Sequence, residues 1–510
     1  ADTVRFATLP TSPGHADAAV GSTSANGSPE PLAYDDLVEP EWDAPEDDAA
    51  VRRRGARPLA RTILLGTAVG AVATAAGALA LEWDRVSALV TAARPRATTR
   101  AAAPLPEQAR PESIGVAIPT SPVAPTTARP DGAVAAGADA PTLGHGADVI
   151  AAGGRHSCAA TLGVTIHCWG LNARGQLGDG SYGTRDSARA VAASLPFTRV
   201  SVGEAHGCAV TRLGDLYCWG EDSSGQLGDA TLVTRNAPVR VAGPGVYRAV
   251  RAGGRHSCAL TADDQVACWG ANDQGQLGDG TTARRATPTL VPFGDSLPVR
   301  HVALGLAHSC AVTADGRAWC WGDNSAGQLG DGSRVRRLAP APVATSARFV
   351  TVAAGNLHSC GVTTDGAVLC WGRNDDGQLG TGGAAGSVPT PSAAALPRGT
   401  RASLVAAGAL HSCALGTDGQ SWCWGWNRHG QLGDSTLLGR RRPTPVRTAE
   451  RFAALSAGYR HSCASTADGR AFCWGNNEAG QLGDGSRDNR PVPTAVRLAA
   501  TLVATPIASR

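Results

Sequence analysis

Cysteine and histidine recur in this chain at a fixed spacing that could support chemistry. Residues 253–270 read GGRHSCALTADDQVACWG, with a histidine two residues before the first cysteine and Trp-Gly directly after the second. The stretch occurs seven times, and the first cysteines of successive copies are 50, 50, 52, 50, 53 and 50 residues apart. Cysteine and histidine in such a pattern could bind a metal ion, perform thiol redox chemistry or form disulfides.

The spacing favours disulfides over metal binding or redox catalysis. Strand alternation places His256, Cys258 and Cys268 on one face, but a structural zinc site takes four ligands and no fourth recurs. There is no Cys-x-x-Cys motif. In the third copy, antiparallel pairing in which the numbers of opposed residues sum to 526 places Cys258 opposite Cys268. Their Cβ atoms would be about 4.5–5.5 Å apart, close to the ~3.8 Å between the Cβ atoms of a disulfide. We predict no metal site, no cofactor and seven disulfides: Cys158 with Cys168, Cys208 with Cys218, Cys258 with Cys268, Cys310 with Cys320, Cys360 with Cys370, Cys413 with Cys423 and Cys463 with Cys473.

Short β-strands must position these residues. The third copy predicts strands over 248–254, 256–261, 266–270 and 288–293, with a Gly-rich loop over 272–281. Four short strands repeated with a period near 50 are typical of propeller blades. The fold class predicted is all-β: a seven-bladed β-propeller of four-stranded antiparallel blades over residues 146–510. The strand-like piece 501–505 is expected to pair near Asp148–Ala152 and close the ring.

Two further sets of repeat residues are predicted to be structural. Each repeat histidine is expected to satisfy backbone groups inside its own blade: His156, His206, His256, His308, His358, His411 and His461. Neighbouring blades should cover both faces of an inner strand, so each tryptophan after a second cysteine is expected to pack toward the disulfide face of an adjacent blade. These are Trp169, Trp219, Trp269, Trp321, Trp371, Trp424 and Trp474.

The repeat also carries a family resemblance. Its pattern GxxHSCALTxDGxxxCWGxNxxGQLGDG resembles the repeat of the regulator-of-chromosome-condensation family, and all seven copies keep the GQLG core. The resemblance implies a seven-bladed propeller, and the cysteine pairs make this chain most similar to exported bacterial members. The departures are Gly207 for Ser, Ala230 after the blade 2 Asp, Thr381 for Asp, and Ser435.

The first 145 residues are predicted to anchor the propeller to a membrane. Residues 1–61 contain eleven acidic residues and six arginines, a net charge of −5, and are interpreted as a disordered acidic cytoplasmic tail ending in a basic stop. Residues 62–81 are twenty residues without a charge, enough at about 1.5 Å per residue to cross a bilayer core of about 30 Å. Residues 82–145 are an Ala/Pro/Thr-rich linker.

The flanking charges predict the orientation of this transmembrane helix. Five arginines lie in the fifteen residues before it and three in the fifteen after it, which favours a cytoplasmic N-terminus and a periplasmic or extracellular propeller. We therefore expect a single-pass inner membrane protein of the bacterial envelope. The alternative is a signal peptide cleaved near Ala78-Leu79-Ala80, which would release a secreted protein.

The loops after GQLGDG are the candidate binding elements, because the blades differ most there. Six of the seven loops carry arginine, so the loops are either exposed turns typical of the family or a cationic rim for an acidic protein or an anionic glycan. The rim candidates are Arg185, Arg235, Arg284, Arg285, Arg336, Arg337, Arg440, Arg441, Arg442 and Arg490. Residues 146–510 contain 34 arginines and 26 acidic residues, a modest excess of +8 that does not indicate a nucleic-acid partner.

No catalytic residues are predicted, because no Ser-His-Asp arrangement, phosphate loop or carboxylate pair stands apart from the repeat. The chain is expected to be a monomeric, non-catalytic module that binds a protein or an anionic glycan. Two alternatives stay open. One is a regulator like a guanine-nucleotide exchange factor, which the resemblance implies. The other is an exported propeller lyase, for which His301 and His429 are the off-consensus histidines to examine.

Overall fold

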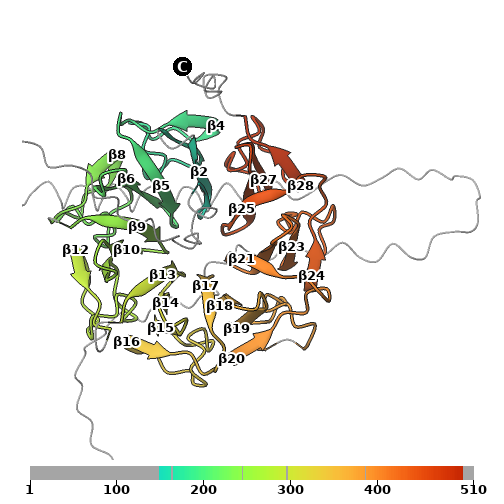
Figure 1. Ribbon diagram of the computed structural model, residues 1–510. Coiled ribbons are helices and arrows are strands. Elements are labelled where there is room, and N and C mark those ends of the chain that lie inside the picture. The colour runs from blue at the N-terminus through green and yellow to red at the C-terminus, as the bar shows by residue number, and fades with distance from the viewer. Residues whose placement is uncertain (1–148, 162–164, 244, 294–296, 385, 498–510) are drawn as a thin grey trace, which may run out of the picture. The chain divides into compact units, whose positions relative to one another are not determined.

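Seven antiparallel sheets of four consecutive strands make up the described part of the chain. Figure 1 shows them arranged around a common axis, so the predicted seven-bladed propeller is confirmed. They belong to one compact unit. The computed structural model describes residues 149–161, 165–243, 245–293, 297–384 and 386–497.

Each blade uses its four strands in chain order, from the axis outward (Figure 1). The first strands are β1(Ile150–Ala152), β5(Phe197–Val202), β9(Tyr247–Ala252), β13(Val299–Leu304), β17(Phe349–Ala354), β21(Ala402–Ala407) and β25(Phe452–Ala457). The second strands are β2(His156–Thr161), β6(His206–Thr211), β10(His256–Thr261), β14(His308–Thr313), β18(His358–Thr363), β22(His411–Gly416) and β26(His461–Thr466). The third strands are β3(Thr165–Gly170), β7(Leu216–Gly220), β11(Val266–Gly270), β15(Ala318–Gly322), β19(Val368–Gly372), β23(Ser421–Gly425) and β27(Ala471–Gly475). The fourth strands are β4(Arg185–Ala190), β8(Arg235–Arg240), β12(Arg285–Leu290), β16(Arg337–Pro342), β20(Val388–Ala393), β24(Arg440–Pro445) and β28(Arg490–Ala495).

Blade 3, the sheet of β9 to β12, has the register predicted for its central hairpin. Cys258 lies opposite Cys268. The fourth strand differs, because it begins at Arg285, three residues before the predicted 288–293. Arg285 lies opposite Gly270, beyond a register shift, and its guanidinium binds Asp279 of the preceding loop. This ion pair holds the end of the loop against the sheet, so the fourth strand begins at Arg285 itself.

The hydrophobic cores lie between the blades. The second and third strands are buried on both faces, which suits apolar residues at successive positions. Each of seven apolar clusters joins the disulfide of one blade to the tryptophan of the next, as Cys463, Cys473 and Trp169 do between blades 7 and 1. Blade-to-blade packing therefore holds the ring together.

Strand direction defines two ends of the ring. Because neighbouring strands are antiparallel, the β1–β2 and β3–β4 connections of blade 1, and their equivalents elsewhere, lie at one end, which we name the upper face. The turns between second and third strands lie at the other end, the lower face.

The predicted tail, transmembrane helix and linker, residues 1–145, lie outside the described residues, as does the expected closing strand 501–505. Within the described ranges, no helix is long and apolar enough to span a bilayer. Blade 7 completes its sheet with four strands of its own, β25 to β28.

Candidate functional site

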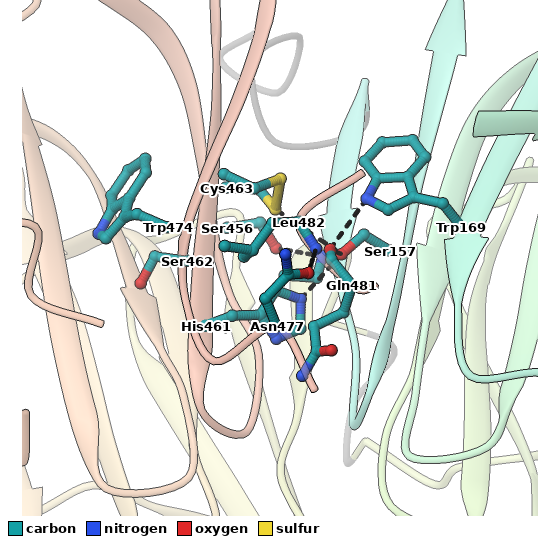
Figure 2. Close-up of a disulfide and its surroundings, with 12 residues drawn as sticks. Ser157, Trp169, Ser456, His461, Ser462, Cys463, Trp474, Asn477, Gln481 and Leu482 are labelled. Carbon is teal, nitrogen blue, oxygen red and sulfur yellow. Dashed lines mark hydrogen bonds between the residues drawn. A yellow bond between two sulfur atoms is a disulfide. The ribbon is translucent and has the colours of Figure 1, made fainter. Parts of the chain in front are cut away.

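A hydrogen-bonded seam joins each blade to the next, and Figure 2 shows the seam between blades 7 and 1. The His461 Nε2 and Ser157 Oγ atoms are 2.8 Å apart. The Ser157 hydroxyl donates to the main-chain oxygen of Gln481 at 3.0 Å, and the Trp169 indole N–H donates to the same oxygen at 2.9 Å. Because the single serine proton is used on Gln481, His461 must donate its Nε2–H, which leaves Nδ1 as the unprotonated nitrogen.

This seam recurs around the ring with one interruption. The His–Ser bond is 2.8–2.9 Å long in five other seams: His206 with Ser257, His256 with Ser309, His308 with Ser359, His358 with Ser412, and His411 with Ser462. Between blades 1 and 2, Gly207 replaces the serine, and neither ring nitrogen of His156 has a hydrogen bond of ordinary geometry. Trp219 still donates to the Gln176 carbonyl there, at 3.0 Å.

The seven seam histidines are neutral structural groups. All are fully buried, and burial lowers the pKa of His156 to about 4 and those of the other six to about 3. The prediction that each histidine satisfies backbone groups of its own blade is wrong. The imidazole begins a second strand on the face that meets the next blade, so its Nε2 reaches that blade's serine.

The cysteines and tryptophans form the apolar part of the same interfaces. All seven disulfides are present, and no free cysteine occurs among the described residues. Each repeat tryptophan packs in the cluster of the preceding blade's disulfide, as predicted. Gly278 makes this packing possible, since a Cβ there would lie 2.6 Å from Trp321 Nε1. In the described ranges, no group of three His, Cys, Asp or Glu side chains is placed to hold a metal ion.

Six of the ten rim arginines are bound within their own loops. Arg285 pairs with Asp279, whose side chain is only 5% exposed. Burial alone would raise the pKa of Asp279, but hydrogen bonds from Thr281 and Arg285 outweigh it and hold the pKa below its ordinary value. The other five pairs are Arg185 with Asp179, Arg235 with Asp229, Arg337 with Asp331, Arg440 with Asp434, and Arg490 with Asp484. These arginines close the loops and are not free for a partner.

Blade 5 lacks both members of this pair. Thr381 stands at the aspartate position, and Val388 stands where the other fourth strands begin with arginine. The sequence shows that the aspartate and the arginine are replaced in the same blade. This joint replacement could have distinguished the arginines that close loops from those that are exposed.

The remaining rim arginines face outward. Arg284, Arg336 and Arg441 are exposed, and each donates to a main-chain oxygen in the preceding blade, at 3.5, 3.4 and 3.0 Å respectively. Arg442 is exposed beside Arg441. Arg334, which sequence reasoning missed, is exposed on the same loop as Arg336.

Apolar side chains stand at the tips of the same loops. Nine large apolar residues are exposed in the described part of the chain, and six of them lie on the upper-face loops that follow GQLGD or its variants. We name these six the loop-tip residues: Tyr182, Leu232, Val233, Val335, Leu437 and Leu438. Scattered exposed apolar residues are ordinary on proteins, but these six lie on equivalent loops of blades 1, 2, 4 and 6.

The two off-consensus histidines lie apart. His301 is on β13 and lines the central channel, where its Nε2 is 3.3 Å from Thr351 Oγ1. His429 lies on the upper face against Trp426, with ring centroids 5.2 Å apart. Burial and then the charge of Arg460 lower the pKa of His429.

A family model described as an RCC1-like domain matches residues 135–451 and 298–508. The chain belongs to the RCC1-like domain family. Its resemblance to the regulator-of-chromosome-condensation repeat is thereby confirmed.

Two curated relatives of this RCC1-like chain come from Arabidopsis thaliana. The ultraviolet-B receptor UVR8 is 33% identical over 154 residues, and the mitochondrial RCC1 domain-containing protein RUG3 is 33% identical over 151 residues. Each match covers 30% of this chain, and the matches cover 35% of UVR8 and 22% of RUG3.

Solved structures share the fold of this RCC1-like propeller. Prp20p of Saccharomyces cerevisiae, reported with its binding to Gsp1p and histones, gives a TM-score of 0.61 at 25% identity over 67% of this chain and 88% of that chain. Human WBSCR16 gives 0.60 at 21% identity over 66% and 94% of the two chains.

Proposed function

We propose that this chain is an exported, membrane-anchored RCC1-like propeller that binds another protein through its loop-tip residues and performs no catalysis itself. The exposure of these six side chains on equivalent upper-face loops is the observation that carries the proposal. Protein interfaces have an apolar core and are enriched in aromatic residues and arginine, so apolar tips such as Tyr182 with arginines beside them suit such a surface.

The arginines on these loops favour an acidic partner. Arg334, Arg336, Arg441 and Arg442 form no ion pair with the residues that the structure describes. An incoming carboxylate would therefore find exposed guanidinium groups beside Val335 and Leu438. An anionic glycan could satisfy the arginines but would leave the apolar tips uncovered, so the acidic protein surface is the better fit.

Export and anchoring are proposed from the cysteines and from residues 62–81. Seven disulfides suit an oxidising compartment, and the charge-free segment is long enough to span a bilayer with the N-terminus in the cytoplasm. Alkylation of the denatured, unreduced protein from its native host should find almost no free thiol. About fourteen free thiols, or a mature mass that lacks residues 62–81, would contradict the disulfides or the anchor respectively.

Site-specific photocrosslinking tests the binding surface. A photoreactive residue replaces Leu232, Val335 or Leu438 in the full chain, and Leu213, which is 79% exposed on the lower face, is the matched control. We expect a protease-sensitive product from the three loop positions and none from position 213. Equal products from all four positions would contradict the proposal, and a product removed only by glycosidases would establish the glycan instead.

A further inference from the structure

The upper end of the central channel is a small cavity lined by the Gly-x-x-His turns of the repeat. The residue after each first glycine varies between blades. Of those that line the cavity, Glu204, Asn356 and Tyr459 are polar, and Gly254 and Leu306 are not. The polar groups come from blades 2, 5 and 7, so they converge on the axis from different directions.

Close approach of the blades engages most of the main-chain donors of the cavity wall. A Cβ at Gly203 would lie 2.2 Å from the carbonyl oxygen of Gly253, so only glycine permits this contact. The Glu204 N–H donates to Gly253 O at 3.1 Å, and the Tyr459 N–H donates to Gly153 O at 3.0 Å. Equivalent bonds start from four more turns: Gly154 to Gly203, Gly254 to Gly305, Leu306 to Gly355, and Ala409 to Gly458.

Acceptors remain available on the same wall. A carbonyl oxygen has two lone pairs, and the six glycine oxygens that accept these bonds each keep a second one. The Glu204 carboxyl is mostly buried, and burial raises its pKa, while the charge of Arg255 and a hydrogen bond with Tyr459 act in the opposite direction. A wall of acceptors beside a carboxylate repels anions and attracts hydrogen-bond donors.

The size of the cavity limits what can enter. Its volume is about 70 Å³, far below the roughly 300–1,000 Å³ of pockets that enclose a whole small molecule. Farther along the channel, the wall includes Arg251, whose charge opposes deeper entry of a cation. The mouth therefore suits the end of one side chain.

We propose that this mouth binds the cationic end of a single lysine or arginine side chain of a partner protein, with Glu204 as its counter-charge and Tyr459 and Asn356 as further contacts. The site is separate from the loop-tip residues and does not depend on them. A basic anchor on the axis would fix the rotation of a partner that the outer loops hold.

The test uses n-butylguanidinium chloride as the probe and the full chain in lipid nanodiscs, with saturation-transfer NMR on the probe. We expect a saturable signal that Glu204→Gln abolishes and that Glu478→Gln retains. Glu478 is the matched control because it is an upper-face carboxylate that is 55% exposed and paired with Arg155. n-Butyrate should give no signal. Absence of a wild-type signal, persistence in Glu204→Gln, or equal binding of n-butyrate would overturn the proposal, and unchanged melting of Glu204→Gln confirms that the variant is folded.

Discussion

Asp222 and Asp229 place two carboxyl groups where five other blades pair an asparagine amide with a carboxylate. In blade 1, Asn172 Nδ2 donates to Asp179 Oδ1 at 3.1 Å, and blades 3, 4, 6 and 7 repeat this bond. Asp222 Oδ1 accepts the Leu227 N–H at 2.8 Å, but its buried Oδ2 has no hydrogen bond of ordinary geometry. Burial first, and then the charge of Asp229, raise the pKa of Asp222 to about 7. A protonated Asp222 can stand in for the amide, so the blade 2 loop is sensitive to pH.

Asp222→Asn should therefore stabilise the propeller at alkaline pH. Because the folded-state pKa lies above the ordinary value, the contribution of Asp222 is complete below pH ~4 and is lost as the pH rises through about 7. We expect the variant to gain roughly 1–3 kcal/mol at pH 8 and much less at pH 5, measured by urea unfolding. Asn172→Asp in blade 1 should show the opposite change. A gain that does not depend on pH would contradict this explanation.

The neutral histidines of the seams predict loss of stability in mild acid. Their pKa values lie below the ordinary value near 6.5, so their contribution is complete above pH 6.5 and declines as the pH falls toward about 3–4. Each histidine costs about 1.4 kcal/mol per pH unit once the unfolded state is protonated. Seven such groups outweigh the opposite trend of Asp222. The urea midpoint, with disulfides intact, should be lower at pH 5 than at pH 7.5, and equal midpoints would refute the role of the histidines.

Removing one seam serine should weaken one joint. Ser257→Ala deletes the acceptor of His206 Nε2–H and the donor to the Gln226 carbonyl. A buried donor left without a partner costs about 1–3 kcal/mol, which thermal unfolding would detect. Ser223→Ala, at an exposed serine, is the control and should change stability by less than about 0.5 kcal/mol. Equal effects of the two variants would argue against the seam.

The absent ion pair of blade 5 can be rebuilt. Thr381→Asp alone should destabilise the loop by about 1–3 kcal/mol, because the new carboxylate would be largely buried without a guanidinium. Adding Val388→Arg supplies the partner that six other blades have, and stability should recover. A double-mutant cycle measures this coupling. Strictly additive effects would show that the loop arginines do not depend on their aspartates.

Contacts that follow from one hairpin or from strand alternation could be predicted from the sequence. The register of Cys258 and Cys268 follows from a ten-residue spacing across a tight turn, and the packing of the tryptophans follows from the two-residue alternation of strands. The turn limits the partner of each cysteine, and the strand face on which a tryptophan lies limits what it can pack against.

Contacts between copies were harder to predict, because all copies look alike. His461 is next to Ser462 in the sequence, yet it binds Ser157, 304 positions away. Nothing within one repeat says whether such a histidine meets its own serine or that of a neighbour. The informative positions are those that differ from the repeat consensus. Gly207 removes only the seam hydrogen bond, and Thr381 and Val388 replace both members of one ion pair.

The order of blades along the chain carries little structural meaning. Each described sheet is built from four consecutive strands, and blade 7 meets blade 1 through the same histidine, serine, glutamine and tryptophan contacts as most other neighbours. A circularly permuted chain that starts at blade 2 would keep every sheet intact. It would also place the new termini at the joint between His156 and Gly207, which already lacks its hydrogen bond. The seven blades are therefore almost equivalent as the first blade of the ring.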